Sequence, residues 1–540
     1  MKKVLFFFVL VLASTGLFSQ QSDLRAWQHL DYRTDSMYGV GSNRAYEEIL
    51  KNKTGKPVVV AILDSGVDFD HEDLKDVMWV NPGEIPGNGI DDDKNGYVDD
   101  IHGWNFLGGK DGRNVAEDTY EVTRVYKSLA YKYETADSSK LNKKQLKEYA
   151  LYKKVKAEVM SKKEAATKNY ERIKTQRDNL LQALDKMEKL FDGKEITKEN
   201  LDSIALGDDS QLSLGKQILE GMLASEEKIE SFDAVKETIK TGYQRGFEYY
   251  GNQSKYSYNT DFDPRSIVGD DYSNSYEKGY GNNTYDGPDA SHGTHVAGIV
   301  AAKRDNEIGM NGIANNVKIM TVRVVPDGDE RDKDVANGII YAADNGASII
   351  NMSFGKLYSS DKEAVDKAVK YAEKKDVLII HAAGNDSKNI DEVDHFPVRK
   401  FAKKKMCGKK TAGNWMEVGA LSYKQGKEHP AVFSNYGQKE VDVFAPGVAI
   451  YSTTPDDQYA SFQGTSMAAP VVAGVAALVR SYYPELSAKE VKKILMESSM
   501  KIDAKVVLPG SADNMVDFST LSSTGGVVNA YNALMMAGKK

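Results

Sequence analysis

The chain has 540 residues, of which 41% are hydrophobic and 28% are charged. This length and composition fit one large or two to three ordinary globular domains, and they exclude a disordered chain, a collagen-like fibre and a polytopic membrane protein. The 79 acidic and 71 basic residues give a net charge of −8, without the basic excess that a nucleic-acid partner needs. With one cysteine, Cys407, no intrachain disulfide can form.

The N-terminal segment has the order of a secretory signal peptide. Lys2 and Lys3 precede an apolar run over residues 4–13, and small and polar residues follow over 14–22. We assign residues 1–20 to the signal; the alternative is a buried N-terminal helix. The apolar run is too short to span a bilayer, and no later stretch is long and apolar enough. The expected product is extracytoplasmic, either periplasmic or secreted.

Strand and helix patterns alternate along much of the chain. Continuous apolar, β-branched runs at 57–63, 317–325, 347–352 and 377–381 are typical of strands buried on both faces. Helical patterns at 334–345 and 360–375 lie between or after them. This alternation predicts an α/β domain with a mostly parallel sheet.

A charged helical block interrupts this domain. No proline occurs between Pro86 and Pro264, and Lys and Glu dominate the middle of that interval. Leu180, Leu184 and Met187 follow a helical spacing there. We therefore divide the chain into a first part of the α/β domain at 21–114, a helical insertion at 115–250, and a second part at 251–540. The balanced charges indicate a solvated surface, with a partner-binding coiled coil as the alternative.

Three short segments carry an acid, an imidazole and a hydroxyl at the ends of predicted elements. Asp64 follows the first strand, His292 opens an Ala/Val-rich helix, and Ser466 opens another apolar helix. Taken singly, the aspartate could be a turn residue and the serine an N-cap. Together they are the groups that nucleophilic acyl transfer needs, because an imidazole must take the serine proton and a carboxylate must orient the imidazole.

These segments resemble the signatures of the subtilisin-like serine proteases. Asp64-Ser65-Gly66, the run His-Gly-Thr-His-Val-Ala-Gly at 292–298 and the run Gly-Thr-Ser-Met-Ala-Ala-Pro at 464–470 match that family in content and in order. The resemblance implies a three-layer α/β fold and an exported serine endopeptidase. Ser466 would be the nucleophile, His292 the general base and then acid, and Asp64 the orienting carboxylate.

The same resemblance implies an oxyanion hole and a primary specificity pocket. Asn385 would donate its side-chain amide to the oxyanion, together with the backbone N–H of Ser466. The two pocket walls would be Ser353, Phe354 and Gly355 on one side and Ala382, Ala383 and Gly384 on the other. Their small, apolar character favours a sizeable apolar substrate side chain. No catalytic cofactor is expected.

Two segments are candidates for structural calcium. Oxygen ligands alternate in the loop at 88–100, where Asp91, Asp93, Asn95 and Asp99 follow the spacing of a calcium loop, with Gly96 at the turn. The alternative is an Asx-rich turn without metal. A second site, formed by Asp73 and Asn306, is implied by the family resemblance alone.

The expected partners are protein or peptide substrates, with contact to a partner or inhibitor through the helical insertion. Two other classes stay open at this point. One is an inactive relative that binds peptides, and the other is a scaffold whose helical block does the work. Labelling of Ser466 by a fluorophosphonate separates the enzyme from the inactive binding module.

Overall fold

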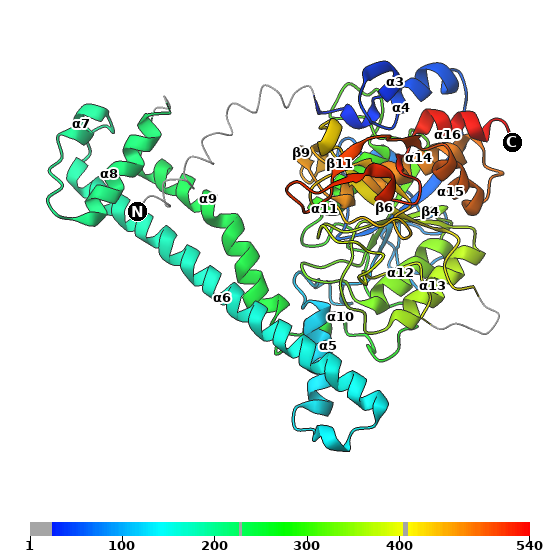
Figure 1. Ribbon diagram of the computed structural model, residues 1–540, viewed down its shortest axis with the longest axis horizontal. Coiled ribbons are helices and arrows are strands. Elements are labelled where there is room, and N and C mark those ends of the chain that lie inside the picture. The colour runs from blue at the N-terminus through cyan, green and yellow to red at the C-terminus, as the bar shows by residue number, and fades with distance from the viewer. Residues whose placement is uncertain (1–23, 226–228, 403–408) are drawn as a thin grey trace. The chain divides into compact units, whose positions relative to one another are not determined.

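The computed structural model describes residues 24–225, 229–402 and 409–540. The predicted signal peptide at 1–20 and Cys407 lie outside these residues. The chain forms two compact units. The sheet unit holds the chain up to Glu121 and again from Asp263 onwards, and the helical unit holds residues 122–262. Figure 1 labels the helices and strands of both units.

A nine-stranded sheet forms the centre of the sheet unit. Its strand order is β10-β13-β7-β6-β5-β4-β1-β3-β2, and only the pair β10–β13 is antiparallel. The strands are β1 (Val58–Asp64), β2 (Gly103–Asn105), β3 (Val317–Arg323), β4 (Ile349–Met352), β5 (Leu378–Ala382), β6 (Trp415–Leu421), β7 (Val443–Pro446), β10 (Met500–Lys501) and β13 (Gly526–Val527).

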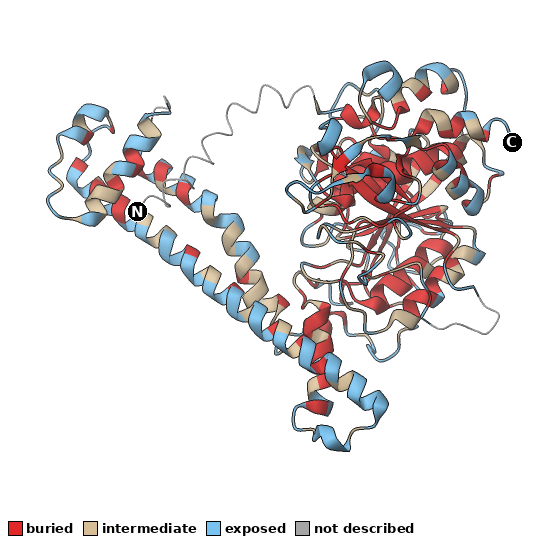
Figure 2. Cartoon of the chain, in the orientation of Figure 1, coloured by how far each residue is buried: buried red, intermediate tan, exposed pale blue. Residues whose placement is uncertain are grey.

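Helices cover both faces of this sheet. Alternate residues of a strand point to opposite faces, so Val60 and Ile62 of β1 enter one hydrophobic core, and Ala61 and Leu63 enter the other. The first core is shared with α11 (Ser291–Ala301), α14 (Thr465–Tyr482), α15 (Ala488–Glu497) and α16 (Ala530–Ala537), and the second with α12 (Asp332–Asp344) and α13 (Lys362–Lys374). Figure 2 shows the strands buried between these layers. The predicted three-layer α/β class is confirmed.

Short elements complete the sheet unit. They are α3 (Tyr32–Asp35), α4 (Ser42–Ala45), α10 (Arg265–Val268), the hairpin β8–β9 (Ile450–Thr454 and Gln458–Phe462) and the hairpin β11–β12 (Lys505–Val507 and Met515–Asp517). Within the described part of the chain, no helix combines the length and the apolar character that crossing a membrane requires.

The helical unit has a small hydrophobic core of its own. Its helices are α5 (Glu121–Tyr133), α6 (Lys143–Phe191), α7 (Lys198–Asp202), α8 (Ser210–Leu223) and α9 (Phe232–Asn252). Leu184 and Met187 of α6 are fully buried against α8 and α9, whereas Leu190 on the same helix is 46% exposed. An Asn142 capping box begins α6. In Figure 2 most of the α6 surface is exposed, as its charged composition predicts.

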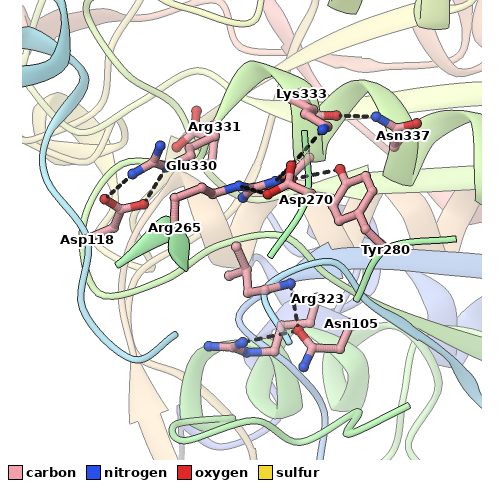
Figure 3. Close-up of polar contacts among 12 residues, drawn as sticks. Asn105, Asp118, Arg265, Asp270, Tyr280, Arg323, Glu330, Arg331, Lys333 and Asn337 are labelled. Atoms are coloured by element: carbon pink, nitrogen blue, oxygen red, sulfur yellow. Dashed lines mark hydrogen bonds and ion pairs between the residues drawn. The ribbon is translucent and has the colours of Figure 1, made fainter. Parts of the chain in front are cut away.

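Within the sheet unit, ion pairs lie where the chain leaves and where it returns, and Figure 3 shows those of Asp118 with Arg331 and of Arg265 with Asp270. Arg331 at the start of α12 binds Asp118 at 2.6 Å and Asp263 at 3.1 Å. Arg265 binds Asp270 at 2.6 Å and Asp334 at 2.7 Å. Because Asp118 and Asp263 bind the same guanidinium, the insertion closes its loop at the N-terminus of α12.

Candidate active site

Asp64 and His292 meet at the carboxyl end of β1. Asp64 is 1% exposed, and its Oδ1 lies 2.7 Å from Nδ1 of His292 at the start of α11. The backbone N–H of Ser65 donates to the same oxygen at 2.8 Å. α11 can approach so closely because residue 293 is glycine: a Cβ there would lie 2.0 Å from the carbonyl oxygen of Gly66. Gly293 of the histidine motif therefore allows α11 to pack closely against the segment that follows β1.

The electrostatics of this pair favour a basic imidazole. Burial lowers the pKa of His292, but the charge of Asp64 and its hydrogen bond more than offset this effect, so the pKa lies above its ordinary value. The side chain of His292 is still 40% exposed. A partly exposed imidazole, oriented by a buried carboxylate, is placed to exchange a proton with a substrate.

Ser466 occupies the first turn of the buried helix α14. Its Oγ donates to the carbonyl oxygen of Ser353 at 3.0 Å, and the hydroxyl of Ser353 donates to the Ser466 carbonyl at 2.8 Å. Pro470 explains the second bond, since it has no N–H for the carbonyl four residues earlier. Ser353 therefore supplies the donor that Pro470 lacks, and it connects one predicted pocket wall to helix α14.

Asn385 is oriented by the residue before the serine. Its Oδ1 accepts hydrogen bonds from the backbone N–H of Thr465 at 2.9 Å and from the Thr465 hydroxyl at 3.0 Å. Its amide nitrogen therefore points the other way. A Cβ on Gly464 would lie 3.5 Å from this nitrogen and 3.5 Å from the backbone nitrogen of Ser466. Two donors thus border one space, which is the arrangement that an oxyanion needs.

The two predicted walls follow neighbouring parallel strands. Ser353, Phe354 and Gly355 come directly after β4, and Ala383 and Gly384 follow Ala382 at the end of β5. The imidazole of His395 lies against both walls, because a Cβ on Gly355 would be 2.4 Å from its Nε2 and one on Gly384 would be 2.9 Å from its Cε1. Sequence reasoning missed His395, which belongs to no recognisable motif.

The other histidines near the motifs have structural contacts. Nε2 of His295 lies 3.0 Å from the carbonyl oxygen of Ile450 in β8, its ring stacks on Phe462, and burial lowers its pKa to about 3. Nε2 of His71 lies 3.1 Å from the carbonyl oxygen of Gln458. Both imidazoles therefore hold the β8–β9 hairpin, and neither competes with His292 as a base.

The loop at 88–100 uses its carboxylates in two ways. Asp91 accepts from the N–H groups of Asn95 and Gly96 at 3.0 and 2.9 Å, and Asp99 accepts from Gly87 and Gly89, both at 2.8 Å. These two groups serve the turns of the loop.

A different set of carboxylates converges. Oxygens of Glu84, Asp93 and Asp100 lie within 4.8 Å of one another, and Asn95 donates its side-chain amide to Asp93 and Asp100. Burial raises the pKa of Asp100 to about 6. Of the four predicted ligands, only Asp93 belongs to this set, and the sequence spacing missed Glu84 and Asp100. Three oxygen donors in one place fit a hard cation such as Ca²⁺.

The second predicted metal pair is also close together. Asn306 donates its side-chain amide to Asp73 at 2.7 Å, and the backbone N–H of Met310 donates to the other carboxylate oxygen at 3.2 Å. Burial raises the pKa of Asp73. The loop around Asn306 therefore folds onto this carboxylate.

Comparison with known proteins identifies the class that this fold and site define. The profile of the subtilase family matches residues 55–522. The chain is 36% identical over 261 residues to the thermophilic serine proteinase of Bacillus sp. (strain AK1), which covers 48% of this chain and 56% of that protein. It is 39% identical over 215 residues to subtilisin DY of Bacillus licheniformis, covering 39% of this chain and 71% of that protein.

A solved structure of proteases from Pseudoalteromonas arctica shares 31% identity with this chain over 46% of its length and 70% of the other chain, with a TM-score of 0.37. The chain spans just over half of the first relative and more than two thirds of the second. Because the family profile covers most of the sequence, this protein belongs to the subtilase family of serine proteinases.

Proposed function

We propose that this protein is an exported serine endopeptidase that hydrolyses peptide bonds through Asp64, His292 and Ser466. The single observation that carries the proposal is the 2.7 Å contact between His292 Nδ1 and the buried Asp64, formed between segments 228 residues apart. The carboxylate holds Nδ1 protonated, so Nε2 is left free to accept a proton. A complete set of this kind argues against a peptide-binding relative without activity.

The chemistry divides into two acyl-transfer steps. The Ser466 hydroxyl rotates away from the Ser353 carbonyl, gives its proton to His292 and attacks the substrate carbonyl carbon. His292 then gives that proton to the leaving amine, and an acyl-enzyme remains. Water repeats the sequence in the second step, with His292 again the base, and releases the acid and free Ser466.

Asn385 and the backbone N–H of Ser466 are proposed to stabilise the oxyanion of each tetrahedral intermediate. The support is their shared border on the space beside Gly464. In subtilisin, a member of the same family, the loss of such a side-chain donor costs about 10²–10³ in turnover. The substrate class that the site serves is a protein or peptide chain, laid along the wall at 353–355 as an added strand.

Removal of the hydroxyl tests this proposal. Ser466→Ala should lower kcat on a peptide substrate by about 10⁶-fold, the loss known for the nucleophile of subtilisin, because the triad acts as a unit. A fluorophosphonate should label the wild type at Ser466 and leave the variant unlabelled. Ser273→Ala is the matched control, since its hydroxyl only binds Asp271 in an exposed loop. Full turnover by Ser466→Ala would contradict the triad assignment.

We also propose that structural Ca²⁺ binds this protein, at Glu84, Asp93 and Asp100 and beside Asp73. The support is the convergence of carboxylate oxygens in the first set. An exported protein with one cysteine cannot form an intrachain disulfide, and a bound cation stabilises the folded state instead. Export itself rests on the charged and apolar order of residues 1–20. Mass spectrometry of the mature N-terminus tests it.

A further inference from the structure

A buried arginine binds the turn at 64–66, which carries Asp64. Arg323 ends β3 and lies opposite Asp64 in the parallel register of β1 and β3. Backbone hydrogen bonds join the two strands there, because the N–H groups of Val324 and Val325 donate to the Asp64 carbonyl at 2.9 and 3.2 Å. The Arg323 side chain reaches one residue further, and its Nε donates to the Ser65 carbonyl at 2.8 Å.

The rest of the guanidinium binds two other parts of the chain. Its Nη1 donates to Oδ1 of Asn105 at 3.1 Å (Figure 3), and its Nη2 donates to the Val115 carbonyl at 2.6 Å. Asn105 ends β2 and is itself held, because its amide donates to Asn114 at 2.7 Å and to Asn282 at 2.8 Å. One planar group thus binds three oxygens, and its rigid fork fixes the direction of each bond.

Residues 285–287 pack on both the guanidinium and the turn. A Cβ on Gly287 would lie 2.2 Å from Nε of Arg323, and a Cβ on Gly66 would lie 2.4 Å from the Asp286 carbonyl oxygen. Helix α11 also approaches the turn closely, at the carbonyl oxygen of Gly66. The turn therefore contacts α11, residues 285–287 and the guanidinium at the same time.

Burial of this guanidinium is unfavourable by itself. Arg323 is 2% exposed, and its hydrogen-bond acceptors among the described residues are uncharged. Burial lowers its pKa to about 10, although the charges of Asp286 and Asp289 act in the opposite direction, so the group is a cation at neutral pH. An apolar side chain of similar size would avoid the cost of taking a cation out of water. It could not supply the three directed hydrogen bonds.

We propose that Arg323 is a positioning residue for the peptidase reaction, which holds the turn so that the Asp64 carboxylate stays against Nδ1 of His292. Ser65 connects the two groups. Its N–H donates to the Asp64 oxygen that contacts the imidazole, and its carbonyl accepts from Arg323. A guanidinium that fixes this carbonyl therefore also fixes the residue whose N–H orients the carboxylate.

This inference rests on the proposed triad and deepens it by a residue that touches no reacting group. The hydrogen bonds of Arg323 go to the turn, to Asn105 and to Val115, and not to the predicted pocket walls. A looser turn should therefore slow the chemical step and leave substrate binding almost unchanged. Misplacement of an orienting group by about 1 Å can cost about 10²-fold in rate.

The test is Arg323→Met, which keeps an unbranched stem and removes every donor. We expect kcat on a peptide substrate to fall by about 10–10²-fold, with a similar fall in the rate of fluorophosphonate labelling at Ser466 and little change in KM. Arg323→Lys keeps the cation but has one nitrogen in place of three, so it should lose less. Each rate is measured well below the unfolding midpoint of the variant, so that unfolded protein does not contribute.

Arg480→Met is the matched control. The Arg480 side chain is 11% exposed, donates to the backbone carbonyls of Ser348 at 3.0 Å and Asp376 at 2.8 Å, and pairs with the Asp376 carboxylate at 2.6 Å. Ser348 and Asp376 precede β4 and β5, at the opposite end of the parallel sheet from Asp64. The control should lower the unfolding midpoint and keep the wild-type kcat and labelling rate.

Two results would overturn the role of Arg323. One is a folded Arg323→Met with the kcat and labelling rate of the wild type, and the other is an equal loss of kcat in Arg480→Met. If Arg323→Met does not fold, Arg323→Lys decides, and a wild-type kcat in that variant overturns the proposal. A wild type that neither labels nor cleaves overturns the peptidase function instead.

Discussion

In the mechanism that we propose, the protonation state of His292 decides whether the site can act. The base must be neutral to take the Ser466 proton, whereas Asp64 favours the imidazolium form. Asp64 therefore raises the pKa of the very group that has to be deprotonated before the first step. The same carboxylate stabilises the imidazolium that forms in the transition state, which is why the higher pKa is compatible with catalysis.

The pH profile of kcat/KM should follow this pKa. Activity is lost as pH falls through the pKa of His292, and because that pKa is raised, we expect the acid limb to have its midpoint above 6.5. In Asp64→Asn the residual activity should show an acid limb at lower pH, because the charge that favours imidazolium is gone.

Asp289→Asn provides a graded control, since the charge of Asp289 also raises the pKa of His292, but by less than Asp64 does. Its acid limb should move in the same direction by a smaller amount. A wild-type limb with a midpoint below 6.5 would contradict this electrostatic role of Asp64.

At the scale of elements, the start of α14 shows how one helix supports several functions. Pro470 removes one helical hydrogen bond, and Ser353 from the segment after β4 replaces it. Thr465 at the first helical position orients Asn385, and its hydroxyl also accepts from the Gly384 N–H at 3.0 Å. Ser466, Asn385 and both predicted pocket walls are therefore connected through the first turn of one buried helix.

The loop at 88–100 leads to a prediction about calcium. The midpoint of thermal unfolding should rise when excess Ca²⁺ replaces chelator, because a ligand that binds only the folded state adds about 2.7 kcal/mol at 100-fold over its Kd. Asp93→Asn should remove most of the rise. Asp92→Asn is the matched control, since its carboxylate binds the Ile85 N–H and the Asn88 amide rather than the converging set.

Asp73→Asn distinguishes the two proposed sites. A rise that persists in Asp93→Asn and disappears in Asp73→Asn would assign the ion to the second site. Equal midpoints with chelator and with calcium in the wild type would contradict both.

At the scale of the whole molecule, the main feature is the helical insertion, which divides the sheet unit into two segments of the sequence. Asp118 and Asp263, which lie beside the two ends of the insertion, both bind the guanidinium of Arg331 in the sheet unit. Such an arrangement tolerates a long insertion, because loop-closure cost grows only slowly with length once the ends are close. The boundaries at 122 and 262 both lie later in the chain than the 115 and 250 predicted from composition, since the charged composition changes before the contacts do at each end.

We predict that the helical unit shields the site, so that it governs the access of large substrates. We expect that replacing residues 122–262 by a short Gly/Ser linker leaves cleavage of small peptides unchanged and accelerates cleavage of folded proteins. The measurement is the ratio of the two rates in both chains. An unchanged ratio would reject shielding, whereas failure of the shortened chain to fold would favour a folding role for the insertion.

The candidate catalytic residues could be named from the sequence because they sit in short contiguous motifs. Asp64, His292 and Ser466 each lie at the end of a strand or the start of a helix that hydrophobic patterning reveals. The position of His395 could not be predicted, because its ring lies against two distant glycines that have no side chains. The predicted calcium ligands did not include Glu84 and Asp100. Turns change the direction in which carboxylates point, so spacing along the loop does not tell which of them converge.

By itself the sequence determined the fold class and the family, and it predicted the reacting groups, because these follow from local periodicity and from motifs that are contiguous in the chain. Only the tertiary structure decided which distant residues are in contact. Asp118 and Asp263 both bind Arg331, and the Ser353 hydroxyl donates to the Ser466 carbonyl that Pro470 leaves without a helical partner. The ring of His395 lies against Gly355 and Gly384. The physical reason is that such contacts depend on long-range packing, which brings together residues that no local pattern relates.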